Sequence, residues 1–359
     1  MVQAVKDSAK SHWVNRAPER IRPYLQLSRL DRPVGYWLLT LPGWIGLAFA
    51  GLSHGLVWMD LVWAVLILIG AITMRGAGCT YNDIVDQDLD AQVERTALRP
   101  LPAGTVTTKQ AWRWTFAQIG VGFLVWLCLP LLAKIIALLA LPLVAAYPFM
   151  KRITWFPQVW LGMTFNWAVL VAYAAKTGTV SLPLFILYLG LIFWTVGYDT
   201  IYACQDIEND AMVGIKSTAR KFGGRVKFWV GVCYSLSIIL IGFAVSLTWF
   251  QIGALFGEWE YPHIGAGLRN SAELHGPIMI DIPPIATMLA LLIPAIHFIQ
   301  QLIKLDLSNQ RSALRIFKSN ALFALILILA LLLLRTYLIE IHFSHEYDLP
   351  NLDDLLTQP

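Results

Sequence analysis

The sequence is short of charged residues. Only 14% of its 359 residues are Asp, Glu, Lys or Arg, whereas 57% are hydrophobic. A soluble domain of this length needs far more polar surface, so the composition excludes an ordinary soluble protein. The chain contains repeated apolar runs near the length that crosses a bilayer as a helix. These runs predict an all-α polytopic membrane protein.

Cysteine is also scarce. The four cysteines, Cys79, Cys128, Cys204 and Cys233, lie in or beside apolar runs and lack the spacing of metal ligands. The pattern therefore argues against a disulfide framework and against a cysteine-based metal site. We interpret these residues as small buried side chains. Tryptophan, by contrast, is abundant at 15 residues, which suits belts at the membrane interfaces.

The apolar runs predict nine transmembrane helices around a central cavity. The expected spans are 34–52, 59–80, 111–129, 131–147, 156–175, 181–203, 227–248, 284–303 and 319–341. Residues 1–33 are then a cytoplasmic N-terminal segment and 34–341 the transmembrane domain. Residues 249–283 form an extracytoplasmic segment within that domain, and 342–359 an extracytoplasmic tail.

The basic residues orient these spans. With nine spans, 22 of the 27 Lys and Arg residues fall on one side, in the N-terminal segment and in alternate connections. By the positive-inside rule this side is cytoplasmic, and an even number of spans would remove the asymmetry. The N-terminal segment resembles neither a secretory signal nor a transit peptide. We therefore expect a multi-pass protein of the cell inner membrane, rather than of the mitochondrial inner membrane, with no nucleic-acid partner.

Two acidic clusters stand at the cytoplasmic ends of apolar runs. The first contains Asn82, Asp83, Asp86 and Asp90, and the second contains Asp199, Asp206 and Asp210. Carboxylates are costly near hydrocarbon, so such clusters favour a functional site. Helical spacing places the members of each cluster on one face, whereas Asp88 points elsewhere.

The ligand chemistry of the clusters favours magnesium over zinc, because they offer oxygen atoms without His or Cys. Magnesium takes few carboxylates and completes its shell with water and phosphate oxygens, so the missing ligand is predicted to be a diphosphate. Two alternatives stay open at this point. The carboxylates could be solvated loop residues, or they could line an ion pathway, although a pathway would place acids nearer the span centres.

Basic residues beside the clusters support the diphosphate hypothesis. Arg95 and Arg99 follow the first cluster and Lys216 follows the second, where cations would neutralise charge on a leaving group. We attribute Lys109, Lys151 and Lys227 to the positive-inside bias alone. Arg75 lies within the second span and is expected to need an anionic partner: an Asp of the cluster, the diphosphate or a substrate carboxylate. Snorkelling to the interface is the alternative.

These residues resemble the UbiA superfamily of intramembrane prenyltransferases. The family pattern Asn-Asp-x-x-Asp-x-x-x-Asp is matched by Asn82, Asp83, Asp86 and Asp90, and its second pattern, Asp-x-x-x-Asp, by Asp206 and Asp210. The segments 29–35, 75–79, 95–104, 198–203 and 214–218 are similar to the branch that prenylates 4-hydroxybenzoate. The resemblance covers about residues 24–340. Two departures are Glu208-Asn209, where relatives often have further Asp, and the long 249–283 segment.

The resemblance implies a magnesium-dependent enzyme of ubiquinone biosynthesis. It would transfer the polyprenyl group of a polyprenyl diphosphate to the ring carbon ortho to the hydroxyl of 4-hydroxybenzoate. Arg75 would hold the benzoate carboxylate, Asp199 would accept the ring proton, and Tyr202 would face the cationic intermediate. Another acceptor, such as homogentisate or a naphthoate, is the alternative within this class, and a transporter is the alternative outside it.

Overall fold

The computed structural model describes residues 12–92, 96–205, 207–212, 214–259, 282–307 and 309–346. Residues 1–11 of the N-terminal segment, most of the 249–283 segment and most of the 342–359 tail therefore lie outside the described residues. All the secondary structure in these ranges is helical. The helices are η1 (Trp13–Arg16), α1 (Arg22–Leu27), α2 (Pro33–His54), α3 (Met59–Val85), α4 (Gln87–Gln92), α5 (Thr108–Cys128), α6 (Leu131–Leu139), α7 (Leu141–Ile153), α8 (Pro157–Thr177), α9 (Leu182–Ala203), α10 (Ile207–Met212), α11 (Thr218–Phe222), η2 (Gly223–Arg225), α12 (Val226–Trp259), α13 (Ile282–Lys304) and α14 (Gln310–Glu346).

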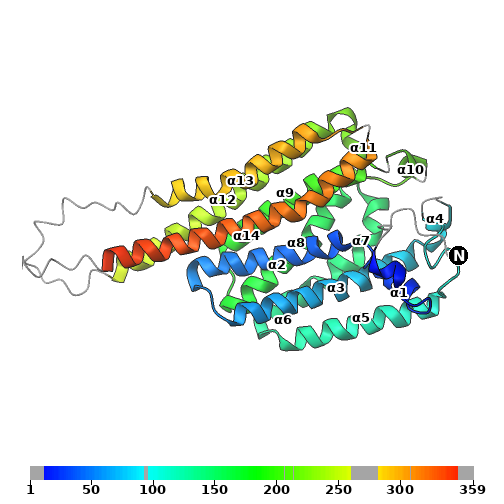
Figure 1. The fold of residues 1–359 in the computed structure, drawn as a ribbon, viewed down its shortest axis with the longest axis horizontal. Coiled ribbons are helices and arrows are strands. Elements are labelled where there is room, and N and C mark those ends of the chain that lie inside the picture. The colour runs from blue at the N-terminus through cyan, green and yellow to red at the C-terminus, as the bar shows by residue number, and fades with distance from the viewer. Residues whose placement is uncertain are drawn as a thin grey trace, which may run out of the picture.

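The long helices run side by side as a bundle, along the horizontal axis of Figure 1. Helix α2 packs against α8, α14 and α3, α9 packs against α12 and α8, and α5 covers α3. One apolar core joins these helices, with Ile45, Val169, Leu187 and Phe323 fully buried within it. The short helices α1, α4, α10 and α11 gather at one end of the bundle (Figure 1).

The outer surface of the bundle is apolar, as a bilayer requires. Large side chains such as Phe116, Leu124, Ile239 and Ile303 are exposed along the helices. Contiguous exposed apolar surface on this scale would be unstable in water. Seven helical segments within the described ranges are long and apolar enough to cross a membrane: 33–54, 59–85, 131–153, 182–203, 218–252, 285–304 and 310–335. The protein is therefore an all-α, multi-pass membrane protein.

The other two predicted spans, 111–129 and 156–175, coincide with α5 and α8, which have 21 residues each. Both helices lie within the bundle, but their polar residues keep them out of the seven apolar segments. In α8 one such residue is the fully buried Asn166, whose amide donates to the carbonyl oxygens of Gly162 and Leu191. A hydropathy average therefore understates how well such a helix is accommodated inside the bundle.

Local sequence explains where several helices begin and break. Thr107 caps α5 in a capping box with Gln110. The predicted span 131–147 is divided into α6 and α7 at Ala140, because Pro142 lacks the N–H that would continue the helix. Helix α12 continues past the predicted end at residue 248 to Trp259, so part of the 249–283 segment is helical.

Candidate functional site

The first acidic cluster lies where α3 ends and α4 begins. Asp83 occupies the last turn of α3, and Asp86 is its C-cap residue. The backbone N–H of Asp86 donates to Asn82 at 2.9 Å and that of Asp90 donates to Asp86 at 2.8 Å. The helical hydrogen-bond pattern thus crosses the break, which keeps the three aspartates on the shared face that their spacing predicts. Asp88 is exposed, as expected for a residue off that face.

Each aspartate of this face is paired with a cation. The Arg29 guanidinium donates from Nη2 to both oxygens of Asp83, at 2.6 and 2.8 Å. Arg99 donates to Asp90 at 2.5 Å and reaches Asp83 at 3.4 Å. Asp86 accepts from Arg152 at 2.7 Å and also from the Lys151 ammonium. The end of α3 is therefore a compact set of alternating charges.

Burial shapes the electrostatics of this set. Burial raises the pKa of Asp90 above its ordinary value, and this effect outweighs the stabilising charge of Arg99. For Arg29, burial acts to lower the pKa, but the combined fields of nearby acids, chiefly Asp83, raise it above its ordinary value. A permanently charged Arg29 is consequently a strong partner for Asp83.

Sequence reasoning missed three of these four cations. Lys151 was attributed to the positive-inside bias alone, and this interpretation is wrong because its ammonium contacts Asp86. Arg29 and Arg152 were not proposed as site residues. Arg29 stands in a segment that resembles the family, which was an available signal. The sequence positions of Lys151 and Arg152 do not indicate their contact with Asp86, because both residues lie in the last turn of a different helix, α7.

Arg75 lies on α3 and points to the first turn of α2. Its guanidinium donates to the backbone carbonyl of Arg29 at 3.4 Å, and any side chain at Gly35 would collide with it. Among the described residues this carbonyl, and no carboxylate, is the partner of Arg75. The expected anionic partner of this arginine is therefore not one of the described aspartates.

The second cluster is described only in part. Asp199 and Tyr202 lie in the last turns of α9, where the Tyr202 ring packs against Phe317 with centroids 4.5 Å apart. Asp206 lies outside the described residues, as does Arg95. Asp210 belongs to α10 by its backbone, and its side chain is not among those described. Asp199 is next to the side-chain amide of Gln158 on α8.

Lys216, which follows the second cluster in the sequence, contacts the C-terminal end of α7. Its backbone N–H donates to the carbonyl of Lys151 at 2.9 Å, and its ammonium donates to the carbonyl of Ile153 at 3.1 Å. Thr218 connects the next residues to α8 and α9. Its hydroxyl shares a hydrogen bond with the hydroxyl of Thr200, and its backbone N–H donates to the side-chain oxygen of Gln158. The segment after the second cluster is thereby fixed beside the cations that hold Asp86.

Tyr147 on α7 supplies a second link. Its hydroxyl lies within the electrostatic range of Asp86 from the first cluster and of Asp199 and Tyr202 from the second. Figure 1 likewise shows α4 and α10 at the same end of the bundle. The two clusters, far apart in sequence, therefore face one region at one end of the molecule.

The donor set of this region fits magnesium. Within the described part of the chain no three His, Cys, Asp or Glu side chains converge closely enough to enclose an ion. Magnesium, however, usually takes one or two carboxylates and keeps water or phosphate oxygens in its other positions. Asp83 and Asp90 meet the same Arg99 guanidinium, so one cation already contacts both carboxylates. The side chains of this region are therefore of the chemical kind that magnesium takes.

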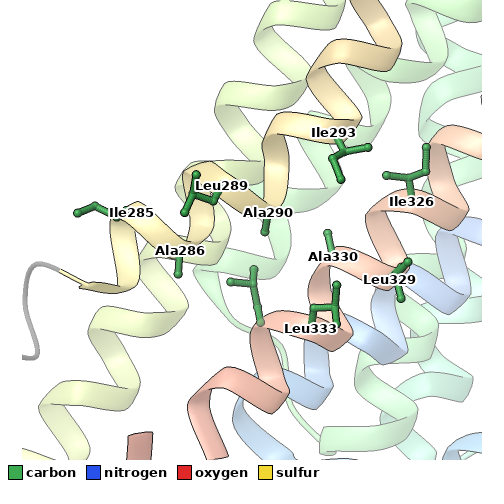
Figure 2. Close-up of a pocket in the computed structure, with 10 residues that line it drawn as sticks. Ile285, Ala286, Leu289, Ala290, Ile293, Ile326, Leu329, Ala330 and Leu333 are labelled. Carbon is green, nitrogen blue, oxygen red and sulfur yellow. The ribbon is translucent and has the colours of Figure 1, made fainter. Parts of the chain in front are cut away.

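An apolar cavity of about 670 Å³ lies elsewhere, between α13 and α14 (Figure 2). Its walls are Ile, Leu and Ala side chains, including Ile285, Leu289, Ile326 and Leu333. It contains no charged side chain and lies towards the opposite end of the bundle from α4 and α10 (Figure 1). The charged region described above is therefore the better candidate for chemistry.

Fold and site together define a class: an all-α membrane protein with aspartates and matched cations at one end of its helices. A model of the UbiA prenyltransferase family matches residues 38–261. The chain belongs to the UbiA prenyltransferase family.

Three curated relatives share one name. The chain is 43% identical over 257 residues to the mitochondrial 4-hydroxybenzoate polyprenyltransferase of Aedes aegypti, covering 70% of this chain and 55% of that protein. It is 40% identical over 272 residues to the protein of that name from Arabidopsis thaliana, covering 74% and 66% respectively. The human protein of that name is 40% identical over 275 residues, covering 75% and 70%. The chain thus spans less than two thirds of the mosquito and plant proteins.

Solved structures share the fold. A UbiA homologue from Aeropyrum pernix K1, in its apo form, superposes with a TM-score of 0.57 at 23% identity, covering 84% of this chain and 98% of that one. A homologue from Archaeoglobus fulgidus bound to GPP and Mg²⁺ gives a TM-score of 0.54 at 17% identity, covering 88% and 99%. At these identities the likeness establishes the fold.

Proposed function

We propose that this chain is a 4-hydroxybenzoate polyprenyltransferase of ubiquinone biosynthesis. It would transfer the polyprenyl group of a polyprenyl diphosphate to the ring carbon ortho to the phenolic hydroxyl and release diphosphate. The observation that carries the proposal is the buried Asp83–Asp86–Asp90 face with its matched cations at one end of an apolar bundle. The names of relatives at about 40% identity support the acceptor.

The residues divide into two groups by charge. We assign the magnesium ligands to Asn82, Asp83, Asp86, Asp90, Asp206 and Asp210. The Archaeoglobus homologue bound to GPP and Mg²⁺ supports magnesium as the cofactor. We assign the diphosphate to Arg95, Arg99 and Lys216, and add Lys151 and Arg152 because they already stand at Asp86. Bound magnesium would neutralise charge on the departing diphosphate.

The remaining residues serve the organic substrates. The bond from the prenyl carbon to the diphosphate oxygen breaks and its electron pair leaves with the diphosphate. The ring then forms a carbon–carbon bond with the allylic cation, and Asp199 accepts the displaced ring proton. We place the acceptor carboxylate at Arg75, whose described partner is a carbonyl, and the face of Tyr202 against the cation.

The membrane setting follows from the same proposal. We propose nine spans, with α5 and α8 crossing as well, around a cavity that excludes water and so protects the allylic cation from hydrolysis. The basic side and the site are cytoplasmic. We propose the cell inner membrane as the location, and the mitochondrial names of the relatives make the mitochondrial inner membrane the specific alternative. Fractionation of the native cells decides between them.

The decisive test is product analysis with purified protein. The protein in detergent, given magnesium, 4-hydroxybenzoate and a polyprenyl diphosphate, should yield a ring-prenylated acid and an equal amount of diphosphate. Homogentisate and a dihydroxynaphthoate in parallel reactions identify the acceptor. Diphosphate release without a prenylated product would contradict the proposal, and so would transport into sealed vesicles without covalent change. Asp206→Asn in the same assay tests Asp206, a proposed magnesium ligand that lies outside the described residues.

A further inference from the structure

The contact between Arg29 and Asp83 is more buried than the ion pairs of Asp86. One guanidinium nitrogen of Arg29 contacts both carboxylate oxygens, at 2.6 and 2.8 Å. The side chains of Arg29 and Asp83 are 10% and 1% exposed. The cations at Asp86 are more accessible, with Lys151 27% and Arg152 43% exposed. Asp83 is therefore covered by a buried partner, whereas Asp86 is paired with cations that reach solvent.

The backbone around Arg29 is held in an unusual conformation. Arg29 has a φ of 55°, and it is the one described residue other than glycine in the left-handed region. Such a conformation costs energy in a residue with a Cβ and persists only where the surroundings impose it. Arginine therefore occupies a position where glycine would be less strained, and its side chain makes the two-point contact with Asp83.

The surroundings that impose this conformation are visible. The hydroxyl of Ser28 donates to Gln118 at 2.9 Å and accepts from the Trp114 indole at 2.8 Å, so α5 anchors the residue before Arg29. Leu27 is fully buried in a small core that also contains Leu101 and Val106. The turn after α1 is thus hydrogen-bonded to α5 and packed against the segment that follows the first cluster.

We propose that Arg29 is a positioning residue: a built-in counter-ion that holds the Asp83 carboxylate in place before metal binds, and that metal must displace. The inference rests on the proposed function because it takes Asp83 as a magnesium ligand. Arg29 contacts both oxygens of Asp83, Arg99 approaches one of them, and the side chain is 1% exposed, so an ion that binds Asp83 has to displace the Arg29 guanidinium. Metal affinity is therefore reduced by the cost of breaking this pair.

The proposal predicts opposite effects on stability and on metal binding. Arg29→Gln removes the competing charge, so Mg²⁺ should bind the purified full chain roughly five-fold more tightly or better, measured by calorimetry without diphosphate. The metal-free protein should unfold at a lower temperature, because buried Asp83 loses its two-point contact and keeps only Arg99, at 3.4 Å. Added Mg²⁺ should then raise the unfolding temperature more in the variant than in the unmodified protein.

Two further variants make the test decisive. Arg22→Gln is the matched control, because Arg22 lies on α1 and donates to the carbonyl of Ala17 without touching an acid. Its Mg²⁺ affinity should match that of the unmodified protein. Arg29→Lys keeps the charge but loses the two-point contact, and its affinity should lie between the two. If Arg29→Gln does not fold, Arg29→Lys decides alone.

The outcomes separate this inference from the proposed function. Unchanged or weaker Mg²⁺ binding in both Arg29 variants, with normal binding by the unmodified protein, overturns the role of Arg29 and leaves the metal site standing. Loss of stability with unchanged Mg²⁺ affinity would make Arg29 structural and also overturns the proposal. If the unmodified protein binds no Mg²⁺ either alone or with inorganic diphosphate present, the metal assignment itself fails, and this inference fails with it.

Discussion

At the scale of single residues, the site is a set of aspartates whose charges are balanced before any substrate arrives. Asp86 shows this most clearly, because it is buried and accepts from both Lys151 and Arg152. A buried carboxylate with two cations is stable only as a set, since removal of one member leaves unpaired charge behind. Each residue of the set is consequently sensitive to substitution in a way that its exposed neighbours are not.

Asp86→Asn should lower kcat/KM for diphosphate release by on the order of 100-fold, because the site loses a ligand charge at the developing leaving group. Asp88→Asn is the matched control: it makes the same chemical change two residues later, at an exposed position. Coupled phosphate detection with each purified variant provides the measurement. Equal losses in the two variants would show that total charge near α4 matters and that the face formed by Asp83, Asp86 and Asp90 does not.

Lys151→Ala should raise KM for the prenyl diphosphate by about ten-fold, with a smaller effect on KM for the acceptor, because the ammonium contacts Asp86 in the proposed diphosphate site. Lys109→Ala, at an exposed lysine in the first turn of α5, should leave both values unchanged. Steady-state kinetics with each substrate varied separately distinguishes the two. An unchanged KM for the prenyl diphosphate in Lys151→Ala would show that this lysine does not bind the diphosphate and reflects only the positive-inside bias.

At the scale of elements, periodicity predicts what lies within a helix and misses what a distant helix contributes. The shared face of Asp83, Asp86 and Asp90 follows from spacing along one segment, and the structure retains it across the break at Asp86. The ion pairs of Asp86 join residues 65 and 66 positions apart, and Arg29 reaches Asp83 across 54 positions. Such contacts depend on how helices pack and how turns fold back, which hydrophobic spacing along one chain does not encode.

Helix packing also explains Arg75. Gly35 in the first turn of α2 leaves the space that the Arg75 guanidinium fills. Gly35→Ala should displace this guanidinium and destabilise the protein by about 1–3 kcal/mol. Gly120→Ala on α5 is the control, because a Cβ there meets open space and should be neutral or slightly stabilising. Thermal unfolding in detergent measures both, and an unaffected Gly35→Ala protein would show that Arg75 does not need this position.

At the scale of the whole molecule, charged side chains are paired at both ends of the bundle. The site end contains the aspartate–cation pairs and the short helices (Figure 1). Towards the other end, Lys176 pairs with Asp60 at 2.5 Å and Arg335 donates to the last turn of α2. Which end of the bundle faces the cytoplasm stays a prediction from the Lys and Arg distribution. The number of crossings is a separate question, because seven segments of the described residues are long and apolar enough, whereas the sequence predicts nine spans.

Accessible cysteines can settle the number of crossings, because α5 lies between two reporter positions. Asp88→Cys, Leu131→Cys and Thr179→Cys would each be placed alone in a chain whose four native cysteines are replaced, at positions that are exposed. If α5 and α8 both cross, a membrane-impermeant maleimide should label residue 88 from the basic side and residues 131 and 179 from the opposite side. If neither crosses, residue 131 should be labelled from the same side as residue 88. Labelling after detergent solubilisation confirms that every cysteine is reactive. The side from which residue 131 is labelled then decides whether the polar helix α5 spans the bilayer.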